Sequence, residues 1–478
     1  MFFIPSSFSD LFLTAAPIFS QPSFQNFLVL VSGWILCTRR RTITHVIQAV
    51  WAQASRKHFS VYYRFFSRAQ WSLDALGQAL FHLCLPLIPT SSVLAIVDDT
   101  LCKKSGPHFF GAAMHHDASA STYGRFTSTG RRVALAFGHR FVILSIWVPL
   151  PWAPHRGVAL PILFRLYRSP RRTPVTHYRK ATQLAGDLVA LLSSWLPSDR
   201  TLTIVGDCEY ACKTLVRALP DQIHFVGPVL RKAALYDFPR PRRGQLRGAP
   251  RLCGKRLATL ARWAGNSRRR WKNTTAVIYG RRVSLMIKHR VCLWFRVAYR
   301  RPVRVVLVHD PKGNYEDQAF FSTDLSLTPE QIIETFARRW TQEVTFRDVK
   351  QHLGLEDPQN GWWRRPPIQR RRKTHRRIPG PQPHATRGAR AVTRTAPLAL
   401  ISYTFVCLWY FQYGQWKQDV QRIRVQSPWY RHKTMPSFVD MLLAARRAFC
   451  TQAFFRQPWP KKPLRFIRRA LQFAGIPA

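Results

Sequence analysis

Residues 93–100 read Val-Leu-Ala-Ile-Val-Asp-Asp-Thr, and residues 201–207 read Thr-Leu-Thr-Ile-Val-Gly-Asp. Each stretch is a short, continuous apolar run that ends in an acidic residue, and such runs predict buried strands. Residues 131–150 predict two further strands joined at Gly138-His139, and residues 184–196 predict an amphipathic helix. This alternation of strands and helices predicts an α/β fold with acidic residues at the carboxyl ends of its strands.

The acidic residues that follow these strands are candidates for a functional site. Only 23 of the 478 residues are Asp or Glu, and open α/β sheets place their sites beyond the carboxyl ends of strands. Asp98 and Asp207 occupy such positions, and Asp99 is a rival for the first of them. The alternatives are structural, because Asp98-Asp99-Thr100 can cap a turn and Asp207 can cap a following helix.

A third acidic residue lies in the helix that residues 329–353 predict. Thr328 and Gln331 match a capping box at its start, and Gly354 suits its end. Glu343 lies near the middle of this helix, where a helical glutamate commonly makes an ion pair with a basic residue one turn away.

One face of the helix combines this acid with basic residues. Phe336, Glu343 and Lys350 are seven residues apart and share a face, and Arg339 and Arg347 lie one turn either side of Glu343. Glu343 can pair with either arginine, or it can bind a metal ion beside cations that bind phosphate. Three carboxylates from distant segments can hold two Mg²⁺ ions, since hard cations prefer oxygen ligands, and two such ions can cleave a phosphodiester.

The charge of the chain predicts a polyanionic partner. It has 74 Lys+Arg against 23 Asp+Glu, a formal net charge of +51, and nucleic acid is the natural candidate. With 46% hydrophobic and 13% aromatic residues, the chain is globular rather than a simple histone-like binder. Basic and aromatic residues interleave over residues 56–68, a pattern that suits DNA contact and equally suits a solvated basic face.

The cysteines and the apolar runs indicate the compartment. Nine cysteines are scattered without a CxxC pair, and Cys208 and Cys212 have no partner pair at zinc spacing. We interpret them as free thiols in a reducing compartment. The apolar run over residues 27–37 is too short to span a bilayer, so neither a membrane segment nor a signal peptide is predicted.

Composition and turn signals divide the chain into six segments. Residues 361–390 contain ten Arg or Lys and no acidic residue, which predicts a flexible linker. Residues 1–90 are predicted to form a helical domain that is a candidate for DNA binding, and residues 91–230 and 311–360 are predicted to form two parts of the α/β core. Between these two parts, residues 231–310 predict a basic β-rich insertion with strands at 275–279, 282–287 and 291–297. The last two predicted segments are the flexible basic segment, 361–394, and a C-terminal helical region, 395–478.

Together these motifs resemble the DDE superfamily of insertion-sequence transposases, in the group with the YREK signature. That signature is Tyr, two residues, Arg, three residues, Glu, six residues and Lys. Here it is matched by Phe336, Arg339, Glu343 and Lys350, with every spacing kept and Phe in place of Tyr. The two aspartate motifs of the family are matched by Asp98-Asp99-Thr100 and Asp207-Cys-Glu-Tyr-Ala211. The resemblance covers nearly the whole chain and is weakest over 1–40 and 361–394.

The resemblance implies a ribonuclease H-like catalytic core interrupted by a β-rich insertion, with an N-terminal helical domain. It implies that Asp98, Asp207 and Glu343 are catalytic and bind two Mg²⁺ ions, for which Mn²⁺ substitutes. Arg339 and Lys350 would bind phosphates near the scissile bond, and Arg347 is a third candidate for that role because of its place on the helix.

The resemblance also implies a function. The chain would bind the terminal inverted repeats of its element, cut double-stranded DNA and join the ends to target DNA. It would act as at least a dimer in the synaptic complex, at the nucleoid in a bacterial cytoplasm. The alternative is a catalytically inactive, DNA-binding remnant, against which the presence of all three carboxylates argues. A basic RNA-binding scaffold would contain RRM or KH motifs, and the sequence contains none.

Overall fold

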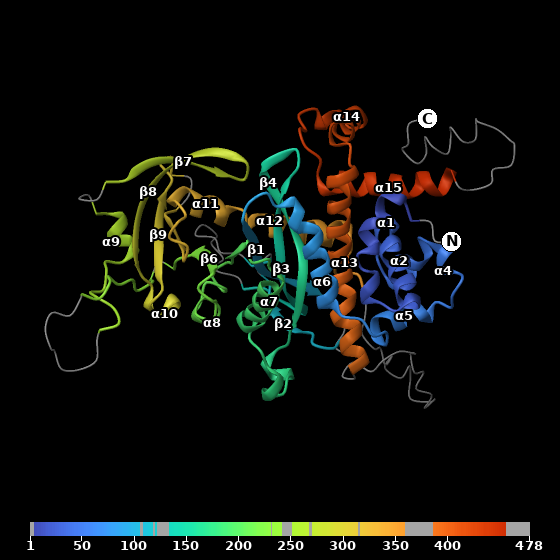
Figure 1. Ribbon diagram of the computed structural model, residues 1–478, viewed down its shortest axis with the longest axis horizontal. Coiled ribbons are helices and arrows are strands. Elements are labelled where there is room, and N and C mark those ends of the chain that lie inside the picture. Colours follow the sequence, from blue (N-terminus) through green and yellow to red (C-terminus); the bar gives the residue numbers. More distant parts are fainter. Residues whose placement is uncertain are drawn as a thin grey trace. The chain divides into compact units, whose positions relative to one another are not determined.

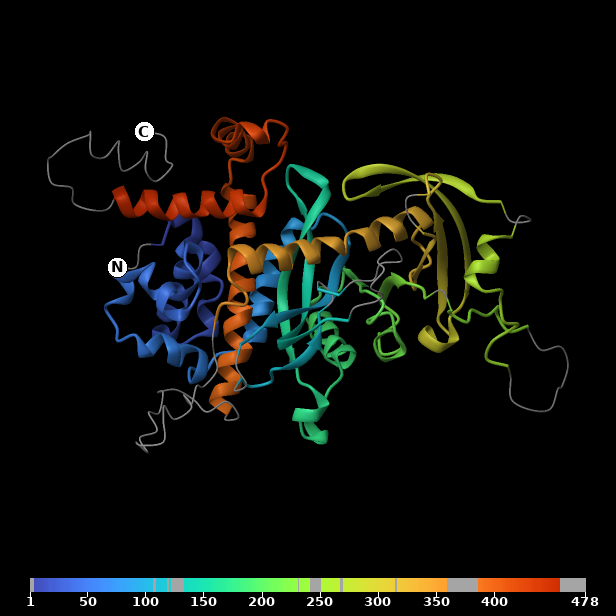
Figure 2. The ribbon, with the colours of Figure 1, turned by 180° about the vertical axis from the view of Figure 1, so that it is seen from behind.

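The computed structural model describes residues 4–105, 109–117, 120–121, 133–230, 232–240, 251–266, 270–313, 316–358 and 386–455 (Figures 1 and 2). The chain forms two compact units. The first contains Met1–Ser72, Asp348–Gln359 and Arg390–Ala478, and the second contains Leu73–Arg347 and Asn360–Ala389. Residues 361–385, most of the predicted flexible segment, lie outside the described residues.

The second unit is built on one ten-stranded mixed sheet, in agreement with the predicted α/β class. Its strands follow the order β2-β3-β1-β5-β6-β10-β9-β8-β7, with β4 also paired to β3. The β1, β5 and β6 strands are parallel, and the other pairs are antiparallel. The strands are β1 (Ser92–Lys103), β2 (Ala113–His116), β3 (Leu135–Leu150), β4 (Ala153–Tyr167), β5 (Thr201–Val205), β6 (Ile223–Pro228), β7 (Lys272–Ile278), β8 (Arg281–Leu293), β9 (Pro302–His309) and β10 (Gln318–Ser322).

Two of the sequence predictions about these strands are wrong. β3 is one continuous strand rather than two strands joined at Gly138-His139. Gly138 serves close packing instead of a turn, because a Cβ there would lie 2.2 Å from the carbonyl oxygen of Cys102 on β1. β1 does not end before Asp98 either, since its antiparallel pairing with β3 continues to Lys103.

The region predicted as a β-rich insertion continues the same sheet. The second predicted run and the first three residues of the third form the single strand β8, whereas residues 295–297, also predicted as strand, lie in the helix α10 (Phe295–Ala298). β10 then pairs with β9 on one side and with β6 on the other. The strands β7–β9 are therefore joined to the rest of the sheet through β10.

The helix predicted over residues 329–353 is two helices, α11 (Pro329–Ala337) and α12 (Trp340–His352). The capping box at Thr328 and Gln331 is confirmed. The helices separate because the backbone N–H groups of Arg339, Thr341 and Gln342 bond three residues back instead of four. Phe336 and Glu343 thus belong to different helices.

The remaining helices of the second unit are short or pack on the sheet. α11 covers the sheet face that carries Leu94, Ile96 and Val205, in one cluster with Ile332 and Ile333. The helix that follows the turn of Asp207 is short, since α8 contains only Lys213–Val216. The other helices of this unit are α6 (Leu73–Cys84), η2 (Leu85–Leu87), η3 (Pro170–Arg172), η4 (Val175–His177), α7 (Ala181–Trp195), α8 (Lys213–Val216) and α9 (Leu260–Ala264).

The first unit is helical, and the two ends of the chain share its core. Phe8 stacks on Trp409 with ring centroids 4.8 Å apart, and Phe12 meets Phe405 edge-on at 5.1 Å. α13 begins at Thr386, nine residues before the start of the C-terminal helical region predicted from residue 395. The helices are α1 (Ser6–Leu13), η1 (Ala16–Ile18), α2 (Gln21–Leu36), α3 (Ile43–Gln48), α4 (Trp51–Ala54), α5 (Ser60–Ser67), α13 (Thr386–Tyr413), α14 (Trp416–Gln426), η5 (Pro428–Tyr430) and α15 (Phe438–Phe455).

Because acids are scarce, buried cations bind backbone carbonyl groups instead. Lys288 donates to the carbonyl oxygens of residues 263, 264 and 266 at 2.9–3.1 Å. Arg394 donates to those of residues 66, 69 and 71, and Arg446 to those of residues 35 and 37. These three cations are therefore part of the packed structure.

The cysteines are all free thiols, as predicted. Among the described residues, one helix is long and apolar enough to cross a membrane, and it spans Arg387–Tyr413 within α13. In its most apolar stretch of 18 residues, 89% of the residues are buried inside the structure.

Candidate active site

Asp98 lies on β1 just beyond the point where this strand stops pairing with β5, whose last paired residue is Val205. Alternation along a strand places Asp98 on the face of Ile96 and places Asp99 on the opposite face. The Asp98 side chain is 13% exposed. One of its oxygens accepts the backbone N–H of Asp99 at 2.8 Å, and the other accepts Nη1 of Arg339 at 3.1 Å.

Asp207 lies in the turn that follows β5, the strand next to β1 in the sheet. Its Oδ1 accepts the backbone N–H groups of Glu209 at 2.9 Å and of Tyr210 at 3.3 Å. These bonds are those of an aspartate that stabilises a turn, the alternative role considered from the sequence. They leave the second carboxylate oxygen of Asp207 without a bond to this turn.

Glu343 lies in the first turn of α12 and accepts Nη2 of Arg339 at 2.6 Å. The same guanidinium thus binds both Glu343 and Asp98. It also lies 5.7 Å above the ring of Phe336, which packs on Phe320 with centroids 4.6 Å apart. Phe336, the residue that departs from the family signature, therefore supports Arg339 through its ring.

The pKa values show that these groups form one electrostatic cluster. Burial and the neighbouring charge of Asp99 raise the pKa of Asp98 to about 8, against an opposing effect of Arg339, and Asp207 raises it further. Burial alone would lower the pKa of Arg339, but Asp98, Glu343 and Asp207 outweigh burial and raise it. The guanidinium of Arg339 therefore binds two carboxylates from distant segments, Asp98 and Glu343, and the charge of Asp207 also acts on it.

Asp99 faces away from this cluster and has its own partners. Arg140 on β3 donates to both of its oxygens, at 2.7 and 2.5 Å. A carboxylate bound in this two-point manner is held in place by the guanidinium. Of the two neighbouring aspartates, Asp98 is the one that faces Arg339 and Glu343.

Arg347 and Lys350 lie farther along α12. Arg347 is exposed, one turn beyond Glu343. Lys350 is seven residues beyond Glu343, about 10 Å along the helix axis, and its Nζ lies 3.8 Å from Glu356. The structure thus brings Arg339 to the carboxylates and places Arg347 and Lys350 along the helix that leads away from them.

The carboxylates suit a hard divalent cation by their chemistry, since all of their donors are oxygens. Within the described part of the chain, no group of three His, Cys, Asp or Glu side chains is close enough to hold an ion. The guanidinium of Arg339 lies between Asp98 and Glu343 and supplies the positive charge there. The oxygen donors of these carboxylates therefore suit Mg²⁺ by their chemistry. In this structure, Asp98 and Glu343 are placed as two carboxylates that share one guanidinium.

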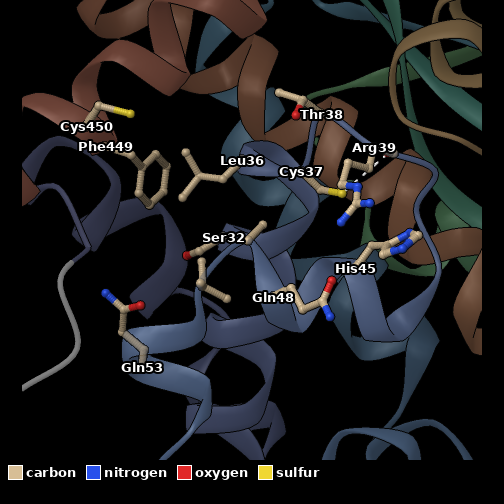
Figure 3. Close-up of a pocket in the computed structure, with 12 residues that line it drawn as sticks. Ser32, Leu36, Cys37, Thr38, Arg39, His45, Gln48, Gln53, Phe449 and Cys450 are labelled. Carbon is tan, nitrogen blue, oxygen red and sulfur yellow. Dashed lines mark hydrogen bonds between the residues drawn. The ribbon is translucent and has the colours of Figure 1, made fainter. Parts of the chain in front are cut away.

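A separate cavity of about 490 Å³ lies in the helical unit (Figure 3). It is walled mainly by α2, the segment after it, and α3, and two free thiols border it. It has no acidic residue, so it does not offer a site for a divalent cation. Its lining residues are Ser32, Leu36, Cys37, Thr38, Arg39, His45, Gln48, Ala49, Val50, Gln53, Phe449 and Cys450.

The sequence did not reveal Arg140, which binds Asp99. Its only signal is its place in an apolar strand, and cross-strand partners are not encoded by local pattern. Glu209 and Tyr210 lie in the motif that begins at Asp207, so the sequence marked the turn that contains them without indicating what they bind.

Known families match two parts of the chain. The model of the DDE superfamily endonucleases matches residues 16–283, more than half of the chain, and includes Asp98 and Asp207. The model of the archaeal ISC1217 transposase matches residues 295–366, which include Arg339 and Glu343. Among curated proteins, none matches the chain. The chain therefore belongs to the DDE superfamily of endonucleases, among its insertion-sequence transposases.

Proposed function

We propose that the chain is an active transposase that cuts and joins DNA with divalent metal ions held by Asp98, Asp207 and Glu343. The observation that supports this proposal is that the guanidinium of Arg339 binds both Asp98 and Glu343, which come from distant segments, while the charge of Asp207 also raises its pKa. Burial at this place raises the pKa of Asp98. Groups of this kind cluster at functional sites.

The strand order supports a ribonuclease H-like core. β4, β3 and β1 are antiparallel neighbours, and β5 and β6 follow as parallel strands. In this arrangement β7–β9 form the insertion, and α12 returns to the sheet, where Thr345 donates to the carbonyl oxygen of Ala159 on β4. That bond fixes the first turns of α12, and with them Glu343, against the sheet.

Each side chain has a distinct task in the proposed reaction. Asp98, Asp207 and Glu343 would hold two Mg²⁺ ions, which activate the attacking water or 3′-hydroxyl and stabilise the leaving oxygen. Arg339 binds Asp98 and Glu343 when no metal is bound, and its guanidinium is suited to bind phosphate oxygens once DNA is present. Lys350 and Arg347 would bind DNA phosphates along α12.

We further propose that the substrate is the inverted-repeat ends of an insertion sequence, paired by a dimer at the nucleoid. The formal net charge of +51 suits a chain that covers two DNA ends. On the helical unit, Phe59 and Tyr63 are 58% and 44% exposed beside Arg56 and Arg64. This surface suits DNA contact, one of the two readings that the sequence pattern allowed.

The test is a nicking assay on a labelled inverted-repeat duplex in Mg²⁺ or Mn²⁺, with a gel shift on the same DNA. The nicking rate of Glu343→Gln should be lower than that of the unmodified protein by about a hundredfold or more, while its DNA affinity should be unchanged. The reason is that Gln retains the size of Glu but not its charge. The control is Glu334→Gln on α11, whose carboxylate accepts the N–H of Val277 at 2.8 Å and which should still cleave.

The outcomes separate the alternatives. Normal cleavage by Glu343→Gln would refute the three-carboxylate mechanism. DNA binding without cleavage by the unmodified protein, in both metals, would identify the chain as an inactive remnant.

A further inference from the structure

The face of β1 opposite Asp98 carries a second charged group, which we call the Arg140 cluster: Asp99, Arg140, Glu209 and Tyr210. Arg140 binds both oxygens of Asp99 and also donates to Glu209 at 2.6 Å. The hydroxyl of Tyr210 donates to Asp99 at 3.0 Å. Three separate segments, β1, β3 and the turn after β5, are therefore tied together by four side chains.

Three of these four side chains have little access to solvent, whereas the Glu209 side chain is 44% exposed. Tyr210 is fully buried, and the Arg140 and Asp99 side chains are 21% and 18% exposed. A two-point guanidinium–carboxylate pair with little solvent access is stronger and more directional than a surface ion pair. Gly206 allows Tyr210 to reach this position, because a Cβ at Gly206 would lie 2.7 Å from the Cβ of Tyr210.

The Asp98 and Asp207 carboxylates both accept hydrogen bonds from backbone N–H groups of the Arg140 cluster. The N–H of Asp99 donates to Asp98, and the N–H groups of Glu209 and Tyr210 donate to Asp207. A shift of Asp99 relative to Glu209 would therefore move the two carboxylates relative to each other.

We propose that Arg140 is a positioning residue that sets the separation of Asp98 and Asp207 for metal binding. The inference rests on the proposed function, since it assigns these aspartates to the metal. Side chains that fix the ligands of a metal without touching it commonly change metal affinity when they are altered. Arg140 acts on the carboxylates through Asp99 and Glu209 and does not itself contact the reacting atoms.

The simpler alternative is an ion pair that only stabilises the fold. Arg290 on β8 offers a matched control, because it binds Asp237 at 2.7 Å and its side chain is 22% exposed, close to the value for Arg140. Arg290→Gln and Arg140→Gln each remove one guanidinium that is similarly buried in the same sheet. Only Arg140 is connected to the two aspartates.

The experiment measures Mn²⁺ binding by isothermal titration calorimetry, thermal unfolding, and the Mg²⁺ concentration that gives half-maximal nicking. Arg140→Gln should weaken Mn²⁺ binding by about 10-fold or more and raise the Mg²⁺ requirement to match. Saturating Mg²⁺ should restore much of the cleavage rate. Arg290→Gln should lower the melting temperature without changing either metal measurement.

Tyr210→Phe is the second variant, which removes one hydroxyl and keeps the ring. Its Mn²⁺ affinity should fall between those of the unmodified protein and Arg140→Gln. If Arg140→Gln does not fold, an unchanged Mn²⁺ affinity in Tyr210→Phe overturns the proposal. A folded Arg140→Gln protein with the Mn²⁺ affinity of Arg290→Gln overturns it as well.

A failure of the proposed function gives a different result. If Asp98→Asn binds Mn²⁺ as tightly as the unmodified protein, the carboxylates do not hold the metal. That result would overturn the metal site together with the role of Arg140.

Discussion

Asp98→Asn should abolish cleavage and, at the same time, stabilise the metal-free protein. Burial and the charge of Asp99 raise the pKa of Asp98 from 3.8 to about 8 in the folded chain. The ionised carboxylate is therefore much less favourable in the folded protein than in the unfolded chain. Asparagine has nearly the same shape and no charge, so it removes this penalty while its oxygen can still accept a bond from Arg339.

The sign and the size of the effect follow from linkage. Because the folded pKa is raised, the folded protein keeps its proton while the unfolded chain loses it. Stability is therefore fully present below about pH 4 and is lost as the pH rises to about 8. Three pH units at about 1.36 kcal/mol each give an upper limit of about 4 kcal/mol at pH 7. The charge-assisted bond from Arg339 becomes weaker in the variant, which reduces the expected gain to about 1–3 kcal/mol.

The assay is thermal unfolding of the metal-free protein between about pH 4.5 and pH 8. We expect the melting temperature of Asp98→Asn to exceed that of the unmodified protein by about 1–5 °C near pH 7.5 and by little at the acidic end. Asp99→Asn is the control. It loses the two-point bond to Arg140 and should be destabilised at neutral pH.

Two results would refute this reasoning. One is a difference in melting temperature that does not grow with pH, because the raised pKa of Asp98 would then have no bearing on folding. The other is an Asp98→Asn protein that is less stable than the unmodified protein near pH 7.5. Retained cleavage by this variant would separately remove Asp98 from the reaction.

Three further predictions follow from charge and packing. DNA binding should weaken steeply with added salt, because Lys and Arg displace counterions from phosphates; fluorescence anisotropy checks this, and a flat plot of log K against log salt contradicts it. Lys288→Met should cost about 1–3 kcal/mol of stability, because three carbonyl groups, one buried and two partly buried, lose their donor; an unchanged melting temperature would show that water replaces the ammonium. Arg339→Gln should tighten Mn²⁺ binding of the DNA-free protein about tenfold, because the guanidinium no longer competes for Asp98 and Glu343; calorimetry measures this, and weaker Mn²⁺ binding would mean that Arg339 orders the carboxylates instead.

The sequence predicted those features that depend on short-range pattern. The strand over residues 201–205 and the capping box at Thr328 are confirmed, because both follow from neighbouring residues alone. The strand-like run before Asp98 also identified β1, although not its full length. β1 continues because β3 pairs with it beyond the point where β5 ends, and the sequence of one strand does not reveal its partner.

The features that the sequence missed depend on contacts between distant residues. The break between α11 and α12 has no Gly or Pro to mark it and arises from a change in backbone bonding at Arg339. Gly138 suggested a turn by composition, whereas the close approach of Cys102 is what requires a glycine there. The candidate carboxylates were predicted by their positions, but the place of Arg339 between two of them became evident only from the structure.

The pairing of β10 with β6 has a consequence for how the sheet folds while the chain is being synthesised. Roughly 90 residues separate β6 from β10, so at ribosomal speeds the hydrogen-bonding edge of β6 waits about 5–20 s for its neighbour. During that interval a partly finished sheet has an open edge, which is a site for pairing with other chains. Nascent chains halted before residue 318 should therefore aggregate or recruit chaperones, whereas chains halted beyond α12 should not.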